Sequence, residues 1–574
     1  MRFVAAILYA IAAAVLLGCG LAFAFQGLTA TTAALALAGG ALLGGFACWR
    51  DRRPLSWPAM NVWDGAALTG FALFAVRAFL WLVFRDRDEI EVLSPNNLGD
   101  LSLHITYVRH FAAGAPFWPE NPIFAGAPLT YPVGMDLFNA LLACVGVDVL
   151  RGFIWVGLIA SACTAAALWK WGRSFAVAGF LFAGGLFGFE FFRRWVVLDY
   201  QSDAAWGGAI EVAWKSLPLA LFVTQRGLLF ALPAGLLLLT SWRARFLEDR
   251  VDAWRLPIWG EVLLYAAMPI FHLHTFLFLS IMAAVWFAAI PGARRHLAFV
   301  VGAAFVPASW QVWQITGHFH GASILGWKPG WMQGDQNFFA FWLMNFGLLP
   351  VLVAALVYAI VRAHRRSSAL IVFPAIAIFL LCCFVKFAPW EWDNTKLMLW
   401  SYLVILPPLW SEVLARWPEW ARIVSCVGLF FSGAISLFGG ISGVHTGYPI
   451  AKRSEIDGVA VALRGIPISE RFIAAPAYNH PLLLNGRIVA MGYSGHAWSH
   501  GLDWRPRLAE VESVLNGGDG WRETAQRLGA RYLFWGREEE EHYAGSPQPW
   551  RDSARVVAAD EWGALYDLTL PPAR

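Results

Sequence analysis

Charged side chains are scarce in this sequence. Asp, Glu, Lys and Arg make up 14% of its 574 residues, whereas soluble domains carry about 25%. Hydrophobic residues make up 58%, so most of the chain is expected to lie in lipid. The formal net charge of +4 is small for this length and is spread over short loops, which gives no indication of a nucleic-acid partner.

Several motifs that carry common chemistries are also missing. The sequence has no GxxxxGK[ST] loop, no GxGxxG after a strand and no GxSxG elbow, so nucleotide hydrolysis, dinucleotide redox chemistry and hydrolase-type catalysis lack their usual carriers. The seven cysteines all lie in apolar segments without a CxxC pair, which argues against a disulfide framework or a cysteine metal site. We expect no cofactor; a divalent metal is possible but not indicated.

Apolar runs long enough to cross about 30 Å of hydrocarbon fill most of the chain before residue 442. They lie near 3–25, 29–48, 62–84, 152–169, 175–192, 217–241, 297–317, 339–362, 368–386, 396–414 and 422–441. The run 258–291 is long enough for two spans, and its interruption between Pro269 and His274 predicts a tight hairpin. We therefore expect a polytopic α-helical membrane protein with about thirteen transmembrane helices.

The basic segments of the chain set the expected topology. With a cytoplasmic N-terminus and alternating spans, five short basic segments, among them 170–173 and 362–366, fall on the cytoplasmic side. This requires residues 132–147 to lie as a short helix in the outer interface instead of crossing. The large loop 85–133 and the chain after about residue 442 then face outward.

The C-terminal part has the composition of a soluble domain. FIAA at 472–475, RIVAMGY at 487–493 and RYLFWG at 531–536 indicate strands, and GWRETAQRLGA at 520–530 indicates a helix. We expect a small α/β domain over residues 446–574.

Asp100 and His104 are the first candidates for chemistry, because they lie four residues apart in the large outer loop. On a helix they share one face, where Asp100 suits a general base or a metal ligand and His104 its partner. The alternative is that Asp100 only caps that helix.

Glu391, Asp393, Asn394 and Lys396 approach the outer end of a later span, in PWEWDNTKLMLW at 389–400. Lys396 could neutralise a lipid phosphate, with Asp393 and Asn394 beside it in a polar cavity. Alternatively, Lys396 snorkels to the interface and Asp393 caps the helix and pairs with it.

Arg226 lies within an apolar span. A guanidinium there favours an anion, and a phosphate bound bidentately is one candidate. The alternative partner is a carboxylate such as Glu211.

Histidines form two further groups. His272 and His274 would point about 200° apart on a helix, so they are not expected to bind one metal together. One of them could line the reaction cavity; the alternative is that it donates a hydrogen bond to a backbone carbonyl freed by Pro269. The C-terminal His480, His496 and His500 surround glycine-rich turns, where a structural loop is favoured over an acceptor or metal site.

The loop 85–133 carries a family resemblance. An acidic residue followed by a histidine, then PENP at 119–122, GAPLTYP at 126–132 and an interfacial helix, is similar to the GT-C superfamily of membrane glycosyltransferases, including protein O-mannosyltransferases and aminoarabinose transferases. WDNTK at 392–396 and GYSGHAWSHG at 492–501 also resemble an uncharacterised bacterial branch.

This resemblance implies an active site at the outer face of the bacterial inner membrane and a periplasmic or extracellular C-terminal domain. It implies transfer of a sugar from a polyprenyl phosphate to a lipid, glycan or protein acceptor, with Asp100 as the base. For this reaction we expect Arg226 and Lys396 to stabilise the departing lipid phosphate. We expect the substrate cavity to be lined by Tyr131, His272, His274, Asp393 and Asn394. Residues 61–445 would form the family's transmembrane domain, and residues 1–60 two additional helices.

The chain departs from the family in those two additional spans and in having one well-placed acid where several members show a pair. Asp88, Glu89 and Glu91 could substitute, but a solvated charge run at a span end is the favoured interpretation. Two rival functions stay open: a transporter or flippase of a glycolipid, and a non-catalytic scaffold that kept the fold.

Overall fold

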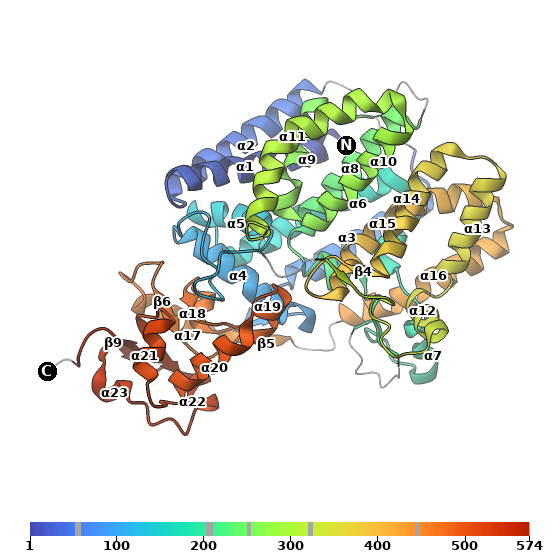
Figure 1. Cartoon of the computed structure of the whole chain (residues 1–574). Coiled ribbons are helices and arrows are strands. Elements are labelled where there is room, and N and C mark those ends of the chain that lie inside the picture. Colours follow the sequence, from blue (N-terminus) through green and yellow to red (C-terminus); the bar gives the residue numbers. More distant parts are fainter. Residues whose placement is uncertain (52–58, 203–209, 249–253, 320–324, 443–446, 573–574) are drawn as a thin grey trace.

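The computed structural model describes residues 1–51, 59–202, 210–248, 254–319, 325–442 and 447–572. Helices dominate up to residue 440, and an α/β unit follows from residue 448 (Figure 1). The expected boundary between residues 445 and 446 lies outside the described residues.

Each apolar run contains at least one helix. The helices are α1 (Arg2–Ala24), α2 (Ala30–Arg50), α3 (Val62–Leu80), α6 (Val149–Phe182), α8 (Leu228–Phe246), α9 (Ile258–Phe271), α10 (Leu273–Ala289), α11 (Arg294–Ile315), α12 (Phe338–Phe346), α13 (Leu349–Arg362), α14 (Arg366–Cys382), α15 (Thr395–Pro408) and α16 (Glu419–Gly440). Among the described residues, seven helical segments are long and apolar enough to span a membrane, or eight if the bent pair α12–α13 counts as one span. The chain is thus a multi-pass membrane protein, and thirteen spans stay a prediction.

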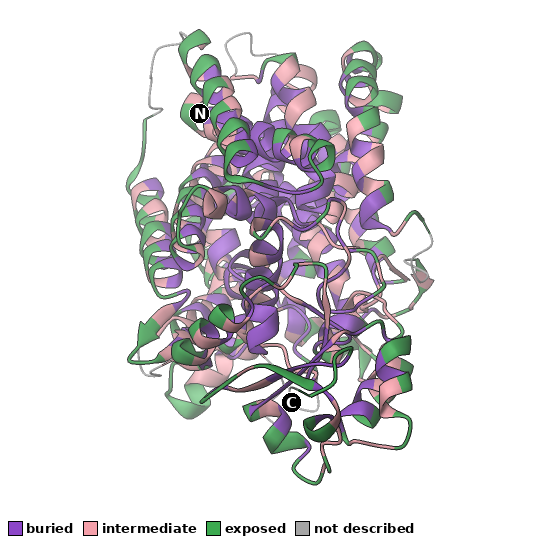
Figure 2. Ribbon diagram, turned by 90° about the vertical axis from the view of Figure 1, so that its left-hand side faces the viewer, coloured by how far each residue is buried: buried purple, intermediate pink, exposed green. Residues whose placement is uncertain are grey.

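Figure 2 shows buried residues gathered inside the bundle.

Two of the breaks between apolar runs have clear local causes. Within α6, the backbone leaves helical geometry at Gly172 and Arg173, and the buried Asp64 holds this kink by accepting the Arg173 guanidinium at 2.6 Å and the Ser174 N–H at 3.1 Å. Between α9 and α10, the chain breaks at His272, whose Nδ1 accepts the Thr275 N–H and so caps α10.

The early loop folds onto the helical part. It contains α4 (Leu98–Ala112), and the short α5 (Gly134–Cys144) follows it where an interfacial helix was expected. Helix α5 packs on α1, α2 and α4. The loop also supplies a hairpin of β1 (Phe84–Asp86) and β2 (Glu89–Val92), and β2 pairs with β5 (Tyr448–Lys452) of the C-terminal unit.

That hairpin explains the acidic run at the start of the loop. The Asp88 carboxylate accepts the backbone N–H of Ser454, and Glu89 and Glu91 lie in β2. These acids therefore join the loop to the C-terminal unit, and none of them lines the cavity described below.

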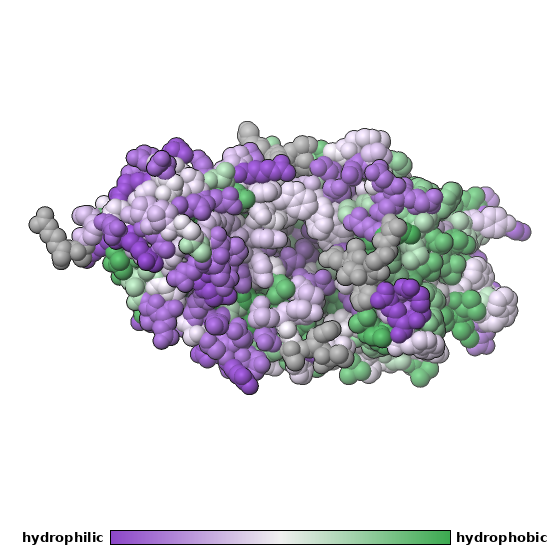
Figure 3. All heavy atoms as spheres, turned by 90° about the horizontal axis from the view of Figure 1, so that it is seen from below, coloured by the Kyte–Doolittle hydropathy of each residue, from purple (hydrophilic) through white to green (hydrophobic). Residues whose placement is uncertain are grey.

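The C-terminal unit is a five-stranded mixed sheet in the order β7-β6-β8-β10-β9. Its strands are β6 (Arg471–Ile473), β7 (Ile488–Val489), β8 (Tyr532–Gly536), β9 (Arg555–Asp560) and β10 (Gly563–Asp567). Its helices are α17 (Arg453–Ala462), α18 (Pro481–Leu484), α19 (Ser494–Ser499), α20 (Trp504–Leu515), α21 (Trp521–Arg527), α22 (Arg537–His542) and α23 (Trp550–Ser553). Three of these strands and α21 lie where the sequence predicted them. Figure 3, seen from the side of this unit, shows hydrophilic side chains gathered over it and hydrophobic ones over the helices.

A buried carboxylate holds the centre of this unit. Glu539 accepts hydrogen bonds from the backbone N–H groups of Ala475 and Gly536 at 2.6 and 2.9 Å, and its Oε1 lies 3.1 Å from His480 Nε2. Burial alone would raise the pKa of Glu539, but His480 and these N–H donors hold it below its usual value. His480 is thus a structural residue here.

We expect Glu539→Gln to destabilise the unit by about 3 kcal/mol, because the backbone donors lose a buried charged acceptor. Since the pKa of Glu539 is depressed on folding, its stabilising effect is full above the unfolded-state pKa of about 4.3 and is lost as pH falls through the folded-state pKa. Hydrogen exchange of peptides 471–475 and 532–536 would measure both effects. Glu540→Gln, on an exposed neighbour, is the control; equal exchange in both variants would contradict the assignment.

Candidate functional site

Two adjoining cavities lie where the early loop, the break between α9 and α10, the start of α15 and the C-terminal unit meet. Their volumes are about 150 and about 220 Å³. The residues that line both are Tyr131, Gln225, Asp393, Lys396, Ser499 and His500. The two cavities thus form one site with two chambers: the first is lined by His272 and His274, and the second by Asp100.

Asp100 lies in the first turn of α4 and lines the second chamber. Asn97 occupies the N-cap position of α4, and among the described residues no side-chain hydrogen bond caps this helix. Asp100 therefore does not cap α4, which was the alternative role considered for it. Burial in the chamber raises the pKa of Asp100, which His104 and Lys396 partly offset and Asp393 reinforces.

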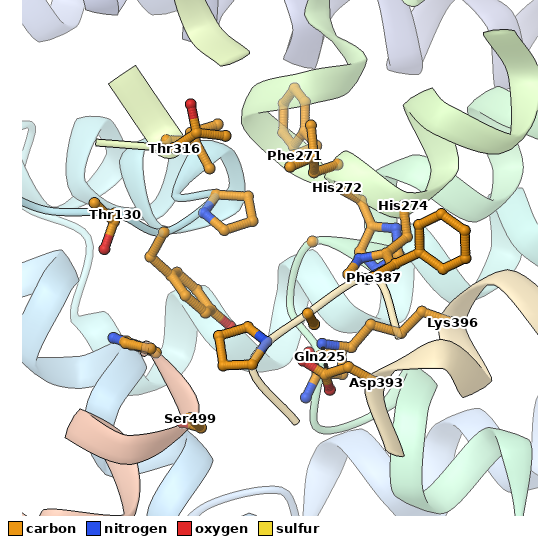
Figure 4. Close-up of a pocket in the computed structure, with 18 residues that line it drawn as sticks. Thr130, Gln225, Phe271, His272, His274, Thr316, Phe387, Asp393, Lys396 and Ser499 are labelled. Atoms are coloured by element: carbon orange, nitrogen blue, oxygen red, sulfur yellow. Dashed lines mark ion pairs between the residues drawn. The ribbon is translucent and has the colours of Figure 1, made fainter. Parts of the chain in front are cut away.

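Lys396 lies at the junction of the chambers. Its Nζ lies 3.0 Å from Asp393 Oδ1, and both side chains are largely buried, with 12% and 17% exposed. Figure 4 shows Lys396 extending toward Asp393 and Gln225, with His272 and His274 on another wall of the first chamber. A mainly buried ammonium facing a cavity can bind an anionic group that enters it.

His104 is oriented by a carboxylate that the sequence analysis did not single out. Its Nδ1 lies 2.9 and 3.0 Å from the two carboxylate oxygens of Asp136 in α5, and both residues are buried. Such a carboxylate fixes the tautomer of an imidazole and leaves Nε2 for other contacts. An acid inside the apolar segment 132–147 was the signal that could have identified Asp136.

Arg226 does not reach the cavity, which corrects the prediction that it binds a phosphate there. Gln225 and Gly227 line the first chamber, whereas the Arg226 guanidinium is buried over the Phe153 ring at 4.5 Å and donates to the Phe153 carbonyl at 3.4 Å. The charge that acts on Arg226 is Asp136. Arg226 therefore compensates the carboxylate that holds His104.

Asn394 is also placed away from the cavity. Its amide donates to the carbonyls of Cys382 and Val385 at 2.8 and 2.7 Å and accepts the Phe387 N–H at 2.9 Å. Asn394 is a structural residue that fixes the segment before α15, and the prediction that it lines the substrate cavity is corrected.

The C-terminal unit completes the site. His500 stacks on Tyr131 with ring centroids 4.9 Å apart. Trp498 of α19 lies against Trp390, with ring centroids 5.6 Å apart. Burial lowers the pKa of His500 to about 3 and that of His496 to about 4, so both imidazoles are neutral at physiological pH. The favoured prediction of a structural loop therefore missed that His496 and His500 line the second chamber.

Candidate metal ligands lie elsewhere. Among the described residues, the three side chains that are close enough to share an ion are Glu538, Glu541 and His542 on α22, and none of them lines either chamber. The absence of a cofactor stays a prediction.

Comparisons with known proteins give distant similarities. No family model matches the chain, and no curated protein matches it. Solved structures that are similar include the oligosaccharyltransferase of Archaeoglobus fulgidus in the apo form, at 11% identity and a TM-score of 0.44, covering 83% of this chain and 69% of that one. Another is the archaeal oligosaccharyltransferase AglB from the same organism in complex with an inhibitory peptide and a dolichol-phosphate, at 11% identity and a TM-score of 0.39, covering 88% and 74%. At these scores neither similarity carries an argument about this chain.

The protonation of Asp100 is directly testable. Because burial raises its pKa, we expect part of the Asp100 carboxyl to stay protonated above the ordinary Asp range of about 3.9. Infrared difference spectra recorded during a pH titration should show a carboxylic-acid band that is absent in Asp100→Asn and present in Asp335→Asn, which removes an exposed acid. A band that survives in Asp100→Asn would belong to another group.

Proposed function

We propose that this protein is an integral-membrane glycosyltransferase of the GT-C type. It transfers a sugar from a polyprenyl-phosphate donor to a lipid, glycan or protein acceptor at the outer face of the inner membrane. The observation that carries the proposal is the joined pair of chambers, with a carboxyl of raised pKa at Asp100 in one and the buried ammonium of Lys396 at their junction. This proposal includes thirteen spans and a C-terminal domain outside the cytoplasm.

In this reaction Asp100 acts as a general base. An acceptor hydroxyl in the second chamber loses its proton to Asp100 as its oxygen bonds to the anomeric carbon. The bond from that carbon to the phosphate oxygen breaks, and the lipid phosphate leaves with the electron pair. Lys396 stabilises the negative charge on this leaving group, since its ammonium is largely buried and the attraction between the two charges is therefore weakly screened.

The remaining residues position the reactants. Trp390 and Trp392 line the chamber of Asp100 and offer flat apolar faces, while His496 and His500 are neutral and can exchange hydrogen bonds with sugar hydroxyls. His272 and His274 line the first chamber with Lys396, where the donor phosphate would lie.

The test of the base is transfer of radiolabel from a panel of polyprenyl-phosphate sugars by the reconstituted protein. We expect Asp100→Asn to lower the rate by about 10²–10⁴-fold, as the loss of a general base does, and Asp335→Asn to leave it unchanged. Full transfer by Asp100→Asn would remove Asp100 from the chemistry. Movement of the labelled lipid without a covalent product would favour the flippase, and stable partner binding with no transfer would favour the scaffold.

The test of the phosphate site is donor affinity. We expect Lys396→Met to raise the KM for the donor by about tenfold or more, the value of a charge-assisted hydrogen bond. Because this change leaves Asp393 without its partner, the double variant Lys396→Met/Asp393→Asn separates loss of the phosphate contact from damage by an unpaired acid. Lys452→Met, which removes an exposed lysine outside both chambers, is the control, and equal KM values in all variants would overturn the role.

A further inference from the structure

A buried imidazole faces the first chamber at the break between α9 and α10. His272 is 4% exposed and lines this chamber. Within the part of the chain that the structure describes, its Nε2 has no hydrogen-bond partner, so it does not bond a backbone carbonyl freed by Pro269. Because a buried polar atom without a partner is costly, one that faces a cavity indicates a ligand that enters the cavity.

The partners of the other ring nitrogen fix the tautomer of His272. The backbone N–H of Thr275 can only donate, and it lies 3.1 Å from His272 Nδ1. Thr275 Oγ1 lies 2.8 Å from the same nitrogen and accepts the indole N–H of Trp400 at 2.7 Å. Nδ1 is therefore an acceptor and carries no proton. Such an imidazole is neutral and has its one proton on Nε2, which is then a hydrogen-bond donor.

The break that carries His272 is supported by Gln311 of α11. The Gln311 amide donates to the Ala266 carbonyl at 3.0 Å and accepts the Ile270 N–H at 2.9 Å. An unbroken helix would join these two backbone groups to each other. The side chain from α11 thus holds α9 up to the break, and the His272 ring has a defined position before a ligand enters.

The start of α10 is a second feature that favours an anion. His272 is the N-cap of this 17-residue helix, and the next two residues, Leu273 and His274, line the same chamber. The first N–H groups of a helix have no acceptor within it, and the helix dipole gives this end a partial positive charge. His272 satisfies the third of these groups, that of Thr275. Helix starts of this kind bind phosphate groups.

Lys396 faces the same chamber from α15. It is close enough for its charge to act on both His272 and His274, and Figure 4 shows its side chain extending into the cavity beneath the two imidazoles. Asp393 balances part of this charge in an ion pair at 3.0 Å. One wall of the chamber thus has a neutral N–H donor at a helix start, and another wall has an ammonium group.

We infer that the donor phosphate is bound between Lys396 and the start of α10, where His272 donates a hydrogen bond from Nε2 to a phosphate oxygen. The inference rests on the proposed function for the identity of this anion, a prenyl phosphate. Because His272 is neutral, it adds a donor for the phosphate without placing a second cation next to Lys396. The alternative acceptor is a sugar hydroxyl, and a prenyl phosphate that carries no sugar separates the two.

Two substitutions of His272 separate the roles of its ring nitrogens. In His272→Asn the side-chain oxygen can still cap α10, but no donor reaches the position of Nε2. In His272→Gln the longer amide can place an N–H near that position, but Gln is not among the residues that cap helices well. We therefore expect His272→Asn to keep the melting temperature of the protein and His272→Gln to lower it.

Binding of farnesyl phosphate and of farnesol, which lacks the phosphate, is measured by calorimetry on the full-length protein in detergent. We expect His272→Asn to weaken binding of farnesyl phosphate by about tenfold, as loss of a hydrogen bond to a charged group does, and to leave binding of farnesol unchanged. His272→Gln should bind farnesyl phosphate more tightly than His272→Asn. His542→Asn removes an exposed histidine outside both chambers and should change neither affinity.

The opposite pattern would show that His272 only caps α10. Native affinity for farnesyl phosphate in His272→Asn would overturn the inference, and so would an equal loss for farnesol, since general damage to the chamber weakens both probes. Failure of the proposed function looks different. No sugar transfer from any donor, with the difference between the two probes and between the variants intact, would remove the reaction and keep the phosphate site.

Discussion

The contact between the early loop and the C-terminal unit is the interaction on which the candidate site depends. Arg109 of α4 donates to the Leu484 carbonyl at 2.7 Å, and the next residue, His110, donates from Nδ1 to the Gly486 carbonyl at 2.8 Å. Gly486 has a φ of 74°, and a Cβ there would lie 2.5 Å from the His110 nitrogen, so only glycine fits. Because α4 carries Asp100 and the C-terminal unit carries His500, this contact brings the two walls of the second chamber together.

Burial of charge gives this site a definite electrostatic order. The Asp136 carboxylate contacts Nδ1 of His104 and so orients it, and the negative charge of Asp136 also acts on the buried Arg226. A buried carboxylate such as Asp136 is costly unless it is paired and hydrogen-bonded. The arginine thus stabilises the site without lining it.

The sequence predicted the parts of this site that depend on the cost of polar groups in a membrane. Lys396 and Asp393 stood out because they are charged groups at the outer end of an apolar run, and His272 because it lies in the break of another run. All three line the cavity, as Asp100 and Tyr131 do. The same criterion cannot say where a side chain points. Gln225 lines the cavity, whereas its neighbour Arg226 points away from it. The orientation of Arg226 depends on its contact with Phe153, which is far away in the sequence.

The C-terminal contribution was harder to predict for a related reason. The strands followed from alternation of apolar residues, which is a local property. The contact of His500 with Tyr131 joins residues that are far apart in the chain, and the pairing of β2 with β5 joins the same two parts of the chain. The glycines around His496 and His500 were correctly taken as signs of a loop, but a loop can line a site as well as support one.

The two-chambered arrangement couples the charge of a bound donor to the strength of the base. Lys396 lowers the pKa of Asp100, whereas Asp393 and burial raise it. A phosphate bound to Lys396 would cancel part of the positive charge that acts on Asp100 and add a negative one, so the pKa of Asp100 would rise further. A base is most effective when its pKa lies near the working pH. Under the proposed function, donor binding would therefore bring Asp100 closer to that condition, and the base would reach its full strength when there is a sugar to transfer.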